Sequence, residues 1–528
     1  MRESALRAHE TRAVPFDYAA LTAMPGWRDG LAWPVDVTVV RTALHGRQRA
    51  FLQFLDRLTN GNERRIATLA GGRALATISA LIEAALAVQG EAATGVRLEG
   101  GPPEIAWLRG EGPDAPPATP QRLGQPERPV NMPLLRRIAR MREWTPLHRM
   151  PAALLAPAAV AVTHNAMLRQ AAARDGRAIG FRHAQLLFPA SAPPAETEAV
   201  TTLSREAAAL LGDIQGLQPT IAARLLRLAE PKVTDLFAQA ARDLAMLASA
   251  GNLPRELWTG SGGYYQARAL GLEVLRRGGK VVRFDHGGST GMIDMPEPLA
   301  MRELSVSSRF VVTTEGAAEL CRMLDGARRN AEDRVVELVG GAGDPHFDQA
   351  LRLPPKPGNG RTVYATGAIY GFRQVIPPVL RDPVYIDWQL RLAAELCRID
   401  PDIVLRPHPE GIFRGKPHPL EAIKSTATTP FETLMAESDV FVFDYPLSTA
   451  FWTAVCSDRP IVFIDLGLAP FHPRVIPLLA ERCEVVRARY DASNIPRVEP
   501  DALADALRRA KRATPDPAPF QRLLAGAV

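Results

Sequence analysis

The stretch between Asp402 and Asp465 constrains the fold most, because it contains two strand–helix–strand steps in succession. Val440–Phe443 and Ile461–Ile464 are uninterrupted apolar runs, as expected for parallel strands that are buried on both faces. Ile403–Arg406 is a shorter run of the same kind. Two such steps predict a doubly wound parallel sheet, and sheets of this kind bind ligands beyond the carboxyl ends of their strands.

The connections between these strands carry helix signals. Thr429 and Glu432 have the spacing of a capping box, with Pro430 between them, which predicts a helix over Phe431–Ala436. After Pro446 ends the following strand, a second helix is expected over Leu447–Val455.

The 528 residues are enough for two to four domains. We predict an N-terminal extension without an assigned role (residues 1–60), a Rossmann-like acceptor domain with a helical insertion (61–352), a Pro- and Gly-rich linker (353–361) and a Rossmann-like nucleotide-donor domain (362–528). Two doubly wound domains that face a cleft describe an α/β protein with a GT-B-like fold.

Several parts of the first domain have specific predictions. Ile66–Ala70 is expected to be a strand, Gly71 and Gly72 a turn, Ala74–Val88 a helix and Gly95–Glu99 a second strand, forming a first βαβ unit. The sequence further predicts a surface loop over Gly100–Pro133, an exposed helix over Leu134–Arg142 and a C-terminal tail, Thr514–Val528, that packs back across the linker.

Composition excludes some classes of protein. The apolar share of 46% and the charged share of 23% are typical of soluble globular domains. The net charge is +6, but no run of five like charges is present, which argues against a nucleic-acid partner. The mildly basic balance is compatible with an anionic substrate or with peripheral binding at the inner face of a membrane.

The cysteines and the N-terminus favour the cytoplasm. Four widely spaced cysteines form no CxxC or Cys/His metal pattern, and the first twelve residues contain no apolar signal core. The longest apolar stretch, Ala74–Val88, contains Glu83 and is too short to span a bilayer. We therefore expect a cytoplasmic protein without a metal site.

His286 is the first candidate catalytic residue. It follows an apolar strand and precedes Gly287 and Gly288, which allow the backbone to approach a ligand and leave amide groups free. A histidine in this place could remove a proton from an acceptor hydroxyl near neutral pH. The alternative is a loop histidine that caps the strand, with glycines that only form a turn.

His408 is the second candidate catalytic residue. Prolines on both sides restrict its backbone, so that the imidazole is held in one direction. Arg406 and His408 could contact a diphosphate, and Glu410 a ribose hydroxyl. The alternative is a rigid turn, since a second His-Pro pair occurs at His418, although only His408 follows a buried strand.

The third candidate site begins at Asp444. Ser448 and Thr449 are expected in the first turn of a helix, where free amides and hydroxyls favour a phosphate. The alternative is ordinary helix capping. The Asp-x-Asp spacing of Asp400 and Asp402 precedes a strand, which is the wrong end for a site, so we assign it no metal.

Together, the loops HGGSTG and RPHP and the segment SDVFVFDYPLSTAFWTAVCSDRPIVFID resemble the CDP-glycerol glycerophosphotransferase family and related enzymes of surface-polysaccharide synthesis. The resemblance implies a GT-B-like fold, His286 as the base, His408 and Arg406 at the donor's phosphates, and Ser448 and Thr449 at the nucleotide diphosphate. Glycine and serine replace the family's Thr-Pro-Leu-Lys after His286, and Pro446 interrupts its Asp-Tyr-Ser-Ser run.

These observations favour an inverting, metal-independent transferase. It would move a sugar or polyol phosphate from a CDP-, CMP- or UDP-linked donor to a glycan or lipid-linked acceptor of the cell surface, without a bound cofactor. Two alternatives remain open: a nucleotide-sugar epimerase on the same fold, and a catalytically silent protein that binds glycan or another subunit.

Overall fold

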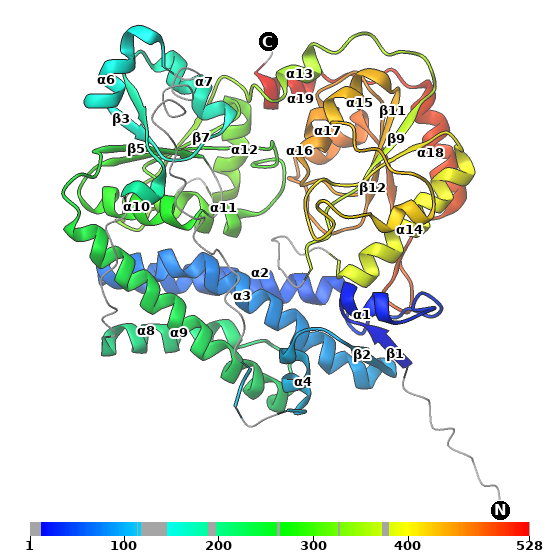
Figure 1. The fold of residues 1–528 in the computed structure, drawn as a ribbon, viewed down its shortest axis with the longest axis horizontal. Helices are drawn as coiled ribbons and strands as arrows, with labels where there is room; N and C mark the ends of the chain where they lie inside the picture. The colour runs from blue at the N-terminus through cyan, green and yellow to red at the C-terminus, as the bar shows by residue number, and fades with distance from the viewer. Residues whose placement is uncertain are drawn as a thin grey trace, which may run out of the picture.

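The computed structural model describes residues 12–112, 115–117, 145–187, 197–260, 264–325, 328–371 and 380–526. Two α/β domains, each built on a parallel sheet, lie side by side above a layer of long helices (Figure 1). The predicted α/β class with two Rossmann-like domains is therefore confirmed.

The first domain contains a six-stranded parallel sheet in the order β4-β3-β5-β6-β7-β8. The strand order reverses between β3 and β5, which is the topological switch point of a doubly wound sheet. Its strands are β3 (Ala159–Ala161), β4 (Ile179–Phe181), β5 (Glu256–Gly260), β6 (Lys280–Phe284), β7 (Arg309–Val312) and β8 (Glu337–Gly340), and its helices include α6 (Met150–Leu155), α7 (Ala166–Asp175), α10 (Tyr265–Arg276), α11 (Pro296–Arg302) and α12 (Glu315–Asp325).

The second domain contains a five-stranded parallel sheet in the order β10-β9-β11-β12-β13. The central strands β9 and β11 are buried along their whole length, as their apolar sequences predict. The elements are β9 (Thr362–Ala365), β10 (Val404–Arg406), β11 (Val440–Phe443), β12 (Ile461–Asp465) and β13 (Glu484–Arg487), with α14 (Asp382–Ile399), α15 (Phe431–Glu437), α16 (Thr449–Val455), α17 (Val475–Arg482) and α18 (Pro500–Arg512).

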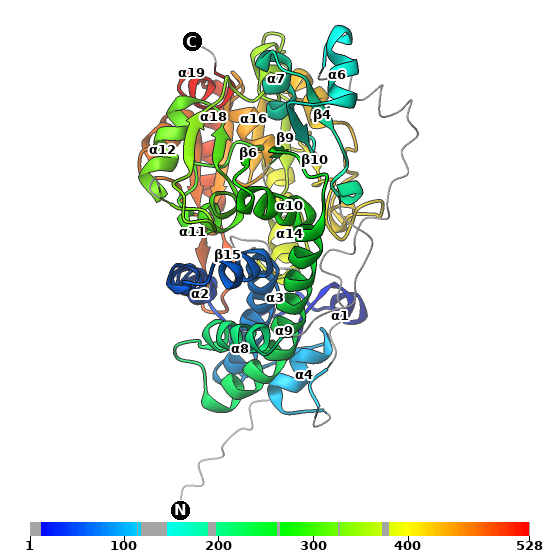
Figure 2. The same cartoon turned by 90° about the vertical axis from the view of Figure 1, so that its left-hand side faces the viewer.

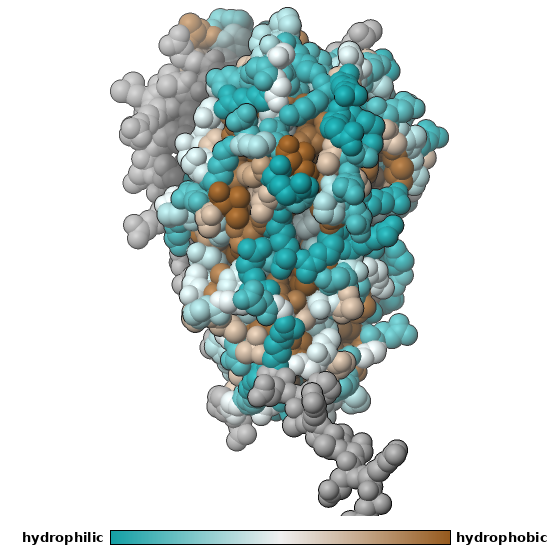
Figure 3. Space-filling model, turned by 90° about the vertical axis from the view of Figure 1, so that its right-hand side faces the viewer, coloured by the Kyte–Doolittle hydropathy of each residue, from teal (hydrophilic) through white to brown (hydrophobic). Residues whose placement is uncertain are grey.

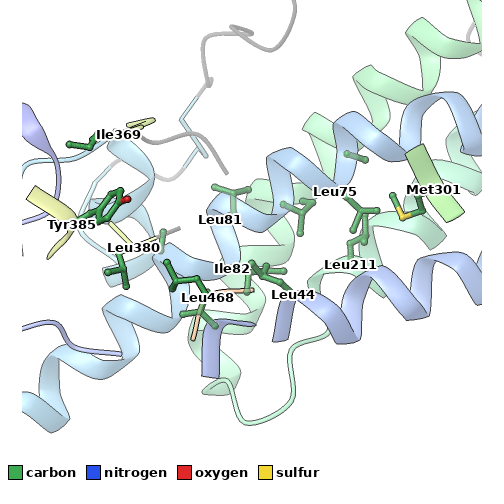
Figure 4. Packing of buried hydrophobic residues seen from close by; sticks show 14 of the residues in the cluster. Leu44, Leu75, Leu81, Ile82, Leu211, Met301, Ile369, Leu380, Tyr385 and Leu468 are labelled. Carbon is green, nitrogen blue, oxygen red and sulfur yellow. The ribbon is translucent and has the colours of Figure 1, made fainter. Parts of the chain in front are cut away.

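A helical layer supports both domains (Figures 1 and 2). It consists mainly of α2 (Val37–Arg57), α3 (Gly61–Thr94), α8 (Glu198–Gly212) and α9 (Pro219–Ser249), with α1 (Tyr18–Ala23), α4 (Pro103–Arg109) and a small sheet of β1 (Arg12–Pro15) and β2 (Val96–Glu99) at one end. Figure 4 shows side chains of α3, among them Leu75 and Ile82, between Leu211 and Met301 on one side and Leu380 and Leu468 on the other. One continuous hydrophobic core therefore joins the layer to both domains.

The predicted N-terminal βαβ unit is wrong in its first part. Ile66–Ala70 and both following glycines lie inside α3, and no strand occupies this segment. The helix is capped at its N-terminus by Asn60, whose side chain accepts hydrogen bonds from the amides of Asn62 and Glu63, and at its C-terminus by Gly95 in the left-handed conformation. Burial on nearly all sides hides the helical period of its apolar residues, so the sequence resembles a strand followed by a turn.

Two other local predictions are corrected. The segment expected to be loop contains α4, which starts at Pro103 and buries Ile105 and Leu108. Leu134–Arg142 lies outside the described residues.

The capping box at Thr429 is absent, because Pro430 itself takes the N-cap position of α15 and no side chain caps the helix.

The C-terminal tail, which was predicted to pack back across the linker, contacts the first domain. The hydroxyls of Thr313 and Thr314, which follow β7, both donate to the carbonyl oxygen of Leu523 at 2.8 Å. Phe520 is fully buried and lies against Trp452 of α16, with ring centroids 6.2 Å apart. The tail thus contacts both domains.

One described helix, α3, is long and apolar enough to cross a membrane, with a mean hydropathy of 1.4 in its most apolar window. Because 78% of that window is buried inside the structure, α3 matches the core helix of a globular protein. The face of the molecule on the side of the second domain is mostly hydrophilic, with small separate hydrophobic patches (Figure 3).

Candidate active site

A cavity of about 340 Å³ lies between the two domains. The loop after β6, the end of α11 and the loops that follow β9, β10 and β11 all contribute to its wall. The carboxyl ends of parallel strands therefore meet at this place, as the doubly wound topology predicts. Of the candidate residues, His286, Gly287, His408, Ser448 and Thr449 line the cavity.

The loop after β6 brings His286 into the cavity. The side-chain amide of Asn165, at the start of α7, donates to the carbonyl oxygens of Phe284 and Asp285 at 3.0 and 3.2 Å. This contact fixes the end of β6 where His286 leaves the sheet. The His286 side chain is exposed to the solvent of the cavity, so an acceptor hydroxyl can reach it.

The two glycines after His286 have different surroundings. Gly287 has a φ of +83°, and a Cβ at this position would lie 3.2 Å from the hydroxyl oxygen of Thr449 in the other domain. Glycine thus allows the two halves of the cavity to approach each other here. Gly288 does not line the cavity, and its missing side chain makes room for the ring of Phe347.

Asp285 is a cavity residue that the sequence analysis did not single out. It is 2% exposed, and its Oδ1 accepts a hydrogen bond of 2.7 Å from the hydroxyl of Thr290. Its Oδ2 has no hydrogen-bond partner among the described residues. Burial raises the pKa of Asp285 to about 7. The sequence signal that could have identified Asp285 is its position directly before His286, at the end of a strand.

A second carboxyl group lies near His286. Asp344, in the loop after β8, is 3% exposed, and its Oδ1 accepts from the amide of His346 at 2.9 Å. Burial raises its pKa, an effect that the nearby His346 and His286 oppose. The candidate base therefore has two buried carboxyl groups in its neighbourhood.

His408 is held from both sides of its loop. Its amide donates to the hydroxyl of Thr366 at 3.3 Å, and its Nδ1 accepts from the amide of Glu410 at 3.1 Å. Burial, and then the charge of Arg406, lower the pKa of His408 and favour the neutral ring. Since Nδ1 is an acceptor, the neutral ring carries its proton on Nε2, which can donate to a phosphate oxygen.

Two predicted phosphate-site residues flank the His408 loop without lining the cavity. Arg406 donates to the carbonyl oxygens of Pro407 at 2.8 Å and Thr429 at 3.3 Å, so its side chain supports the loop. Glu410 is exposed and pairs with Arg414 at 3.2 Å. The competing histidine, His418, is buried away from the cavity.

Asp444 is also absent from the cavity wall. It is 1% exposed and accepts hydrogen bonds from Tyr364 at 2.8 Å, Trp388 at 2.9 Å, Tyr385 at 3.2 Å and the amide of Gly367 at 3.2 Å. These four donors, which come from β9, the loop after β9 and α14, hold Asp444 and with it the start of the loop after β11. The predicted phosphate-site residue Asp444 therefore makes its contacts inside the second domain and not in the cavity.

Ser448 and Thr449 present their side chains at the start of α16. Ser448 is the N-cap residue, but its side chain makes no capping hydrogen bond. The alternative of ordinary capping therefore does not describe Ser448. Because α16 has only seven residues, the two hydroxyls rather than a long helix dipole are the distinguishing groups at this wall.

Three further wall residues had no sequence signal. Tyr370 follows β9, Tyr445 follows β11, and Arg302 ends α11, a helix that the sequence analysis did not place. Arg302 brings a positive charge to the cavity from the first domain, whereas Ser448 and Thr449 belong to the second.

Metal ligands do not gather anywhere in the described ranges, where no group of three or more His, Cys, Asp or Glu side chains could hold an ion. Asp400, of the Asp-x-Asp pair, lies at the opposite end of the second sheet. Its carboxylate accepts from Thr362 and Lys511, both at 2.7 Å.

No family model and no curated protein matches this chain. Among solved structures, the glycotransferase of kitacinnamycin matches with a TM-score of 0.33 and 14% identity, over 69% of this chain and 92% of that chain. The wall teichoic acid polymerase TagF, a CDP-glycerol glycerophosphotransferase, matches with a TM-score of 0.30 and 11% identity, over 74% and 92%. A histidine-to-alanine variant of TagF matches with a TM-score of 0.31.

Proposed function

We propose that this protein is a transferase that uses a nucleotide-activated donor. The observation that carries the proposal is the meeting of His286 from the first domain with His408, Ser448 and Thr449 from the second in one cavity. This arrangement supplies a base for an acceptor hydroxyl on one side and donors for a departing phosphate on the other.

In the proposed reaction, His286 removes the proton of an acceptor hydroxyl while the hydroxyl oxygen attacks the transferred group. The bond between that group and the nucleotide's phosphate breaks, and the departing phosphate takes the electron pair. Nε2–H of His408 and the hydroxyls of Ser448 and Thr449 stabilise the new negative charge. The reaction inverts configuration and needs no metal.

The transferred group is a sugar or a polyol phosphate, and the acceptor is a glycan or lipid-linked glycan of the cell surface. This choice follows the three motifs that resemble the CDP-glycerol glycerophosphotransferase family. A lipid-linked acceptor would bring the cytoplasmic protein to the inner face of the membrane.

The test combines binding and turnover. Thermal unfolding is measured with CDP, CMP, UDP, UMP and GDP, since a ligand at 100 times its dissociation constant adds about 2.7 kcal/mol to the stability of the folded state. We expect nucleotides of one nucleobase to stabilise the wild type and His286→Ala equally. His408→Ala should lose this stabilisation, and His286→Ala should lose turnover.

His148→Ala is the matched control. His148 is an exposed histidine in the short 3-10 helix Leu147–Arg149, which precedes α6, and it does not line the cavity. Turnover by His286→Ala at the wild-type rate would contradict the role of His286. Product formed from donor alone would indicate an epimerase, and the absence of nucleotide binding would indicate a silent binding protein.

A further inference from the structure

A cluster of arginines lies behind the wall of the first domain. Arg268 of α10, Arg283 of β6 and Arg302 of α11 surround Glu303, and the charges of Arg283, Glu303 and Arg302 all act on Arg268. Three guanidinium groups thus share one nearby carboxylate, which leaves the cluster with an excess of positive charge.

Two of these arginines have internal partners. Arg283 is 1% exposed and its Nε donates to Glu303 at 2.9 Å. Arg268 is 4% exposed and donates to the carbonyl oxygens of Arg302 at 2.5 Å and Thr68 at 3.0 Å. These contacts join α3, α10 and α11, so Arg268 and Arg283 have a structural role.

Arg302 differs from both. Its half-buried side chain lines the cavity, and its guanidinium makes no hydrogen bond and no ion pair with any residue in the described part of the chain. Burial lowers its pKa, and the nearby charge of Glu303, which already pairs with Arg283, opposes this effect only in part. A desolvated cation in a cavity is favourable only when a ligand carries the missing negative charge.

We propose that Arg302 binds a phosphate group of the substrate. A guanidinium offers two parallel N–H donors that match the oxygens of a phosphate, and the bond is stronger because both partners are charged. Tyr445 of the second domain lines the same cavity as Arg302, so the phosphate would be bound where the two domains meet. The cavity therefore has an anion subsite on the first domain in addition to the hydroxyls and His408 of the second.

The proposal rests on the proposed function only in expecting a phosphate-bearing substrate. That phosphate can belong to the diphosphate of the donor or to the acceptor. The chemistry at Arg302 is the same in both cases, and the test separates them.

The test uses the full chain and three probes: pyrophosphate, the nucleoside diphosphates CDP and UDP, and glycerol 3-phosphate. Binding is measured by titration calorimetry at several salt concentrations for the wild type, Arg302→Met and Arg302→Lys. Arg302→Met should weaken binding by about 10- to 100-fold, as expected for the loss of a charge-assisted hydrogen bond, and should reduce its salt dependence. Arg302→Lys keeps the positive charge but not the two parallel N–H donors, so its affinity should lie between those of the wild type and Arg302→Met.

The pattern of losses identifies the source of the phosphate. A loss for pyrophosphate and the nucleotides places the donor diphosphate at Arg302, whereas a loss confined to glycerol 3-phosphate places the acceptor there. Arg309→Met is the control, because Arg309 is an exposed arginine of β7 that pairs with Glu337 at 2.7 Å, and it should bind as the wild type does.

Two results would overturn the proposal: Arg302→Met binding every probe as the wild type does, with the same salt dependence, or a wild type that binds no phosphate probe. Loss of pyrophosphate binding in Arg302→Met, in a protein that binds no nucleotide, would reject the proposed function and leave the anion subsite in place. If Arg302→Met does not fold, Arg302→Lys supplies the same comparison.

Discussion

At the scale of single residues, the environment of Asp285 decides how the cavity responds to pH. Its carboxyl group is buried directly before the candidate base, and one of its oxygens has no partner among the described residues. Burial raises its pKa from 3.8 to about 7. The charge beside His286 therefore changes across the neutral range rather than in acid.

This shift predicts a loss of stability as pH rises. Between pH 4 and 7 the unfolded chain ionises Asp285 while the folded chain keeps it protonated, so the folded state is progressively disfavoured. The full effect of moving a carboxyl pKa from 3.8 to about 7 is on the order of 4 kcal/mol. Asp285→Asn lacks this dependence, so its stability relative to the wild type should increase from pH 4 to 7 and then level off.

Urea unfolding of both proteins at several pH values measures the difference. Comparing the two variants cancels the contributions of all other titrating groups. Parallel stability curves would show that Asp285 ionises at its ordinary pKa in the folded protein.

At the scale of elements, the packing of α3 against α2 depends on Gly71, a glycine that the sequence pattern placed in a turn. A Cβ on Gly71 would lie 2.3 Å from a ring carbon of Phe51 on α2, whereas a Cβ on the adjacent Gly72 would meet nothing within 4 Å. Gly71 thus sets how closely α2 and α3 approach each other, and Gly72 does not.

The two glycines therefore predict opposite effects of the same substitution. Gly71→Ala should destabilise the protein by about 1–3 kcal/mol through overpacking against Phe51. Gly72→Ala should stabilise it by about 0.5–1 kcal/mol, because alanine loses less backbone entropy than glycine in a helix. Denaturant midpoints of the two variants test this, and equal effects would contradict the packing argument.

At the scale of the whole molecule, the C-terminal tail couples the domains that form the cavity. Phe520 packs against Trp452 of α16, the helix that starts at Thr449, while the next turn of the tail binds Thr313 and Thr314 of the first domain. The tail therefore links α16, which begins at the cavity, to the segment that follows β7 in the first domain.

Phe520→Ala should lower the free energy of unfolding by about 3–5 kcal/mol. Because the tail contacts both domains, hydrogen exchange should increase in β7 and α12 of the first domain as well as in α16. Arg522→Ala is the control, since Arg522 is an exposed tail residue and should change little. Faster exchange in the second domain alone would show that the tail does not couple the two.

The sequence by itself determined three strands of the second sheet, β10, β11 and β12, and the loops after strands that carry His286 and His408. Runs such as Val440–Phe443 are apolar without interruption because both faces of a parallel strand are covered, and this signal is local. The position of His286 and His408 after such runs was enough to expect them at one edge of their sheets, since all carboxyl ends of a parallel sheet lie on the same side.

Only the tertiary structure decided which side chains face the cavity and which elements are buried on all sides. Asp444 follows β11 and Arg406 is the last residue of β10, close to His408, yet hydrogen bonds to distant residues turn both away from the cavity. Arg302 enters the cavity from a helix end with no local signature, and α3 appears as strand and turn in sequence because burial all around removes its amphipathic period. These outcomes depend on contacts between residues far apart in the chain, which local patterns do not contain.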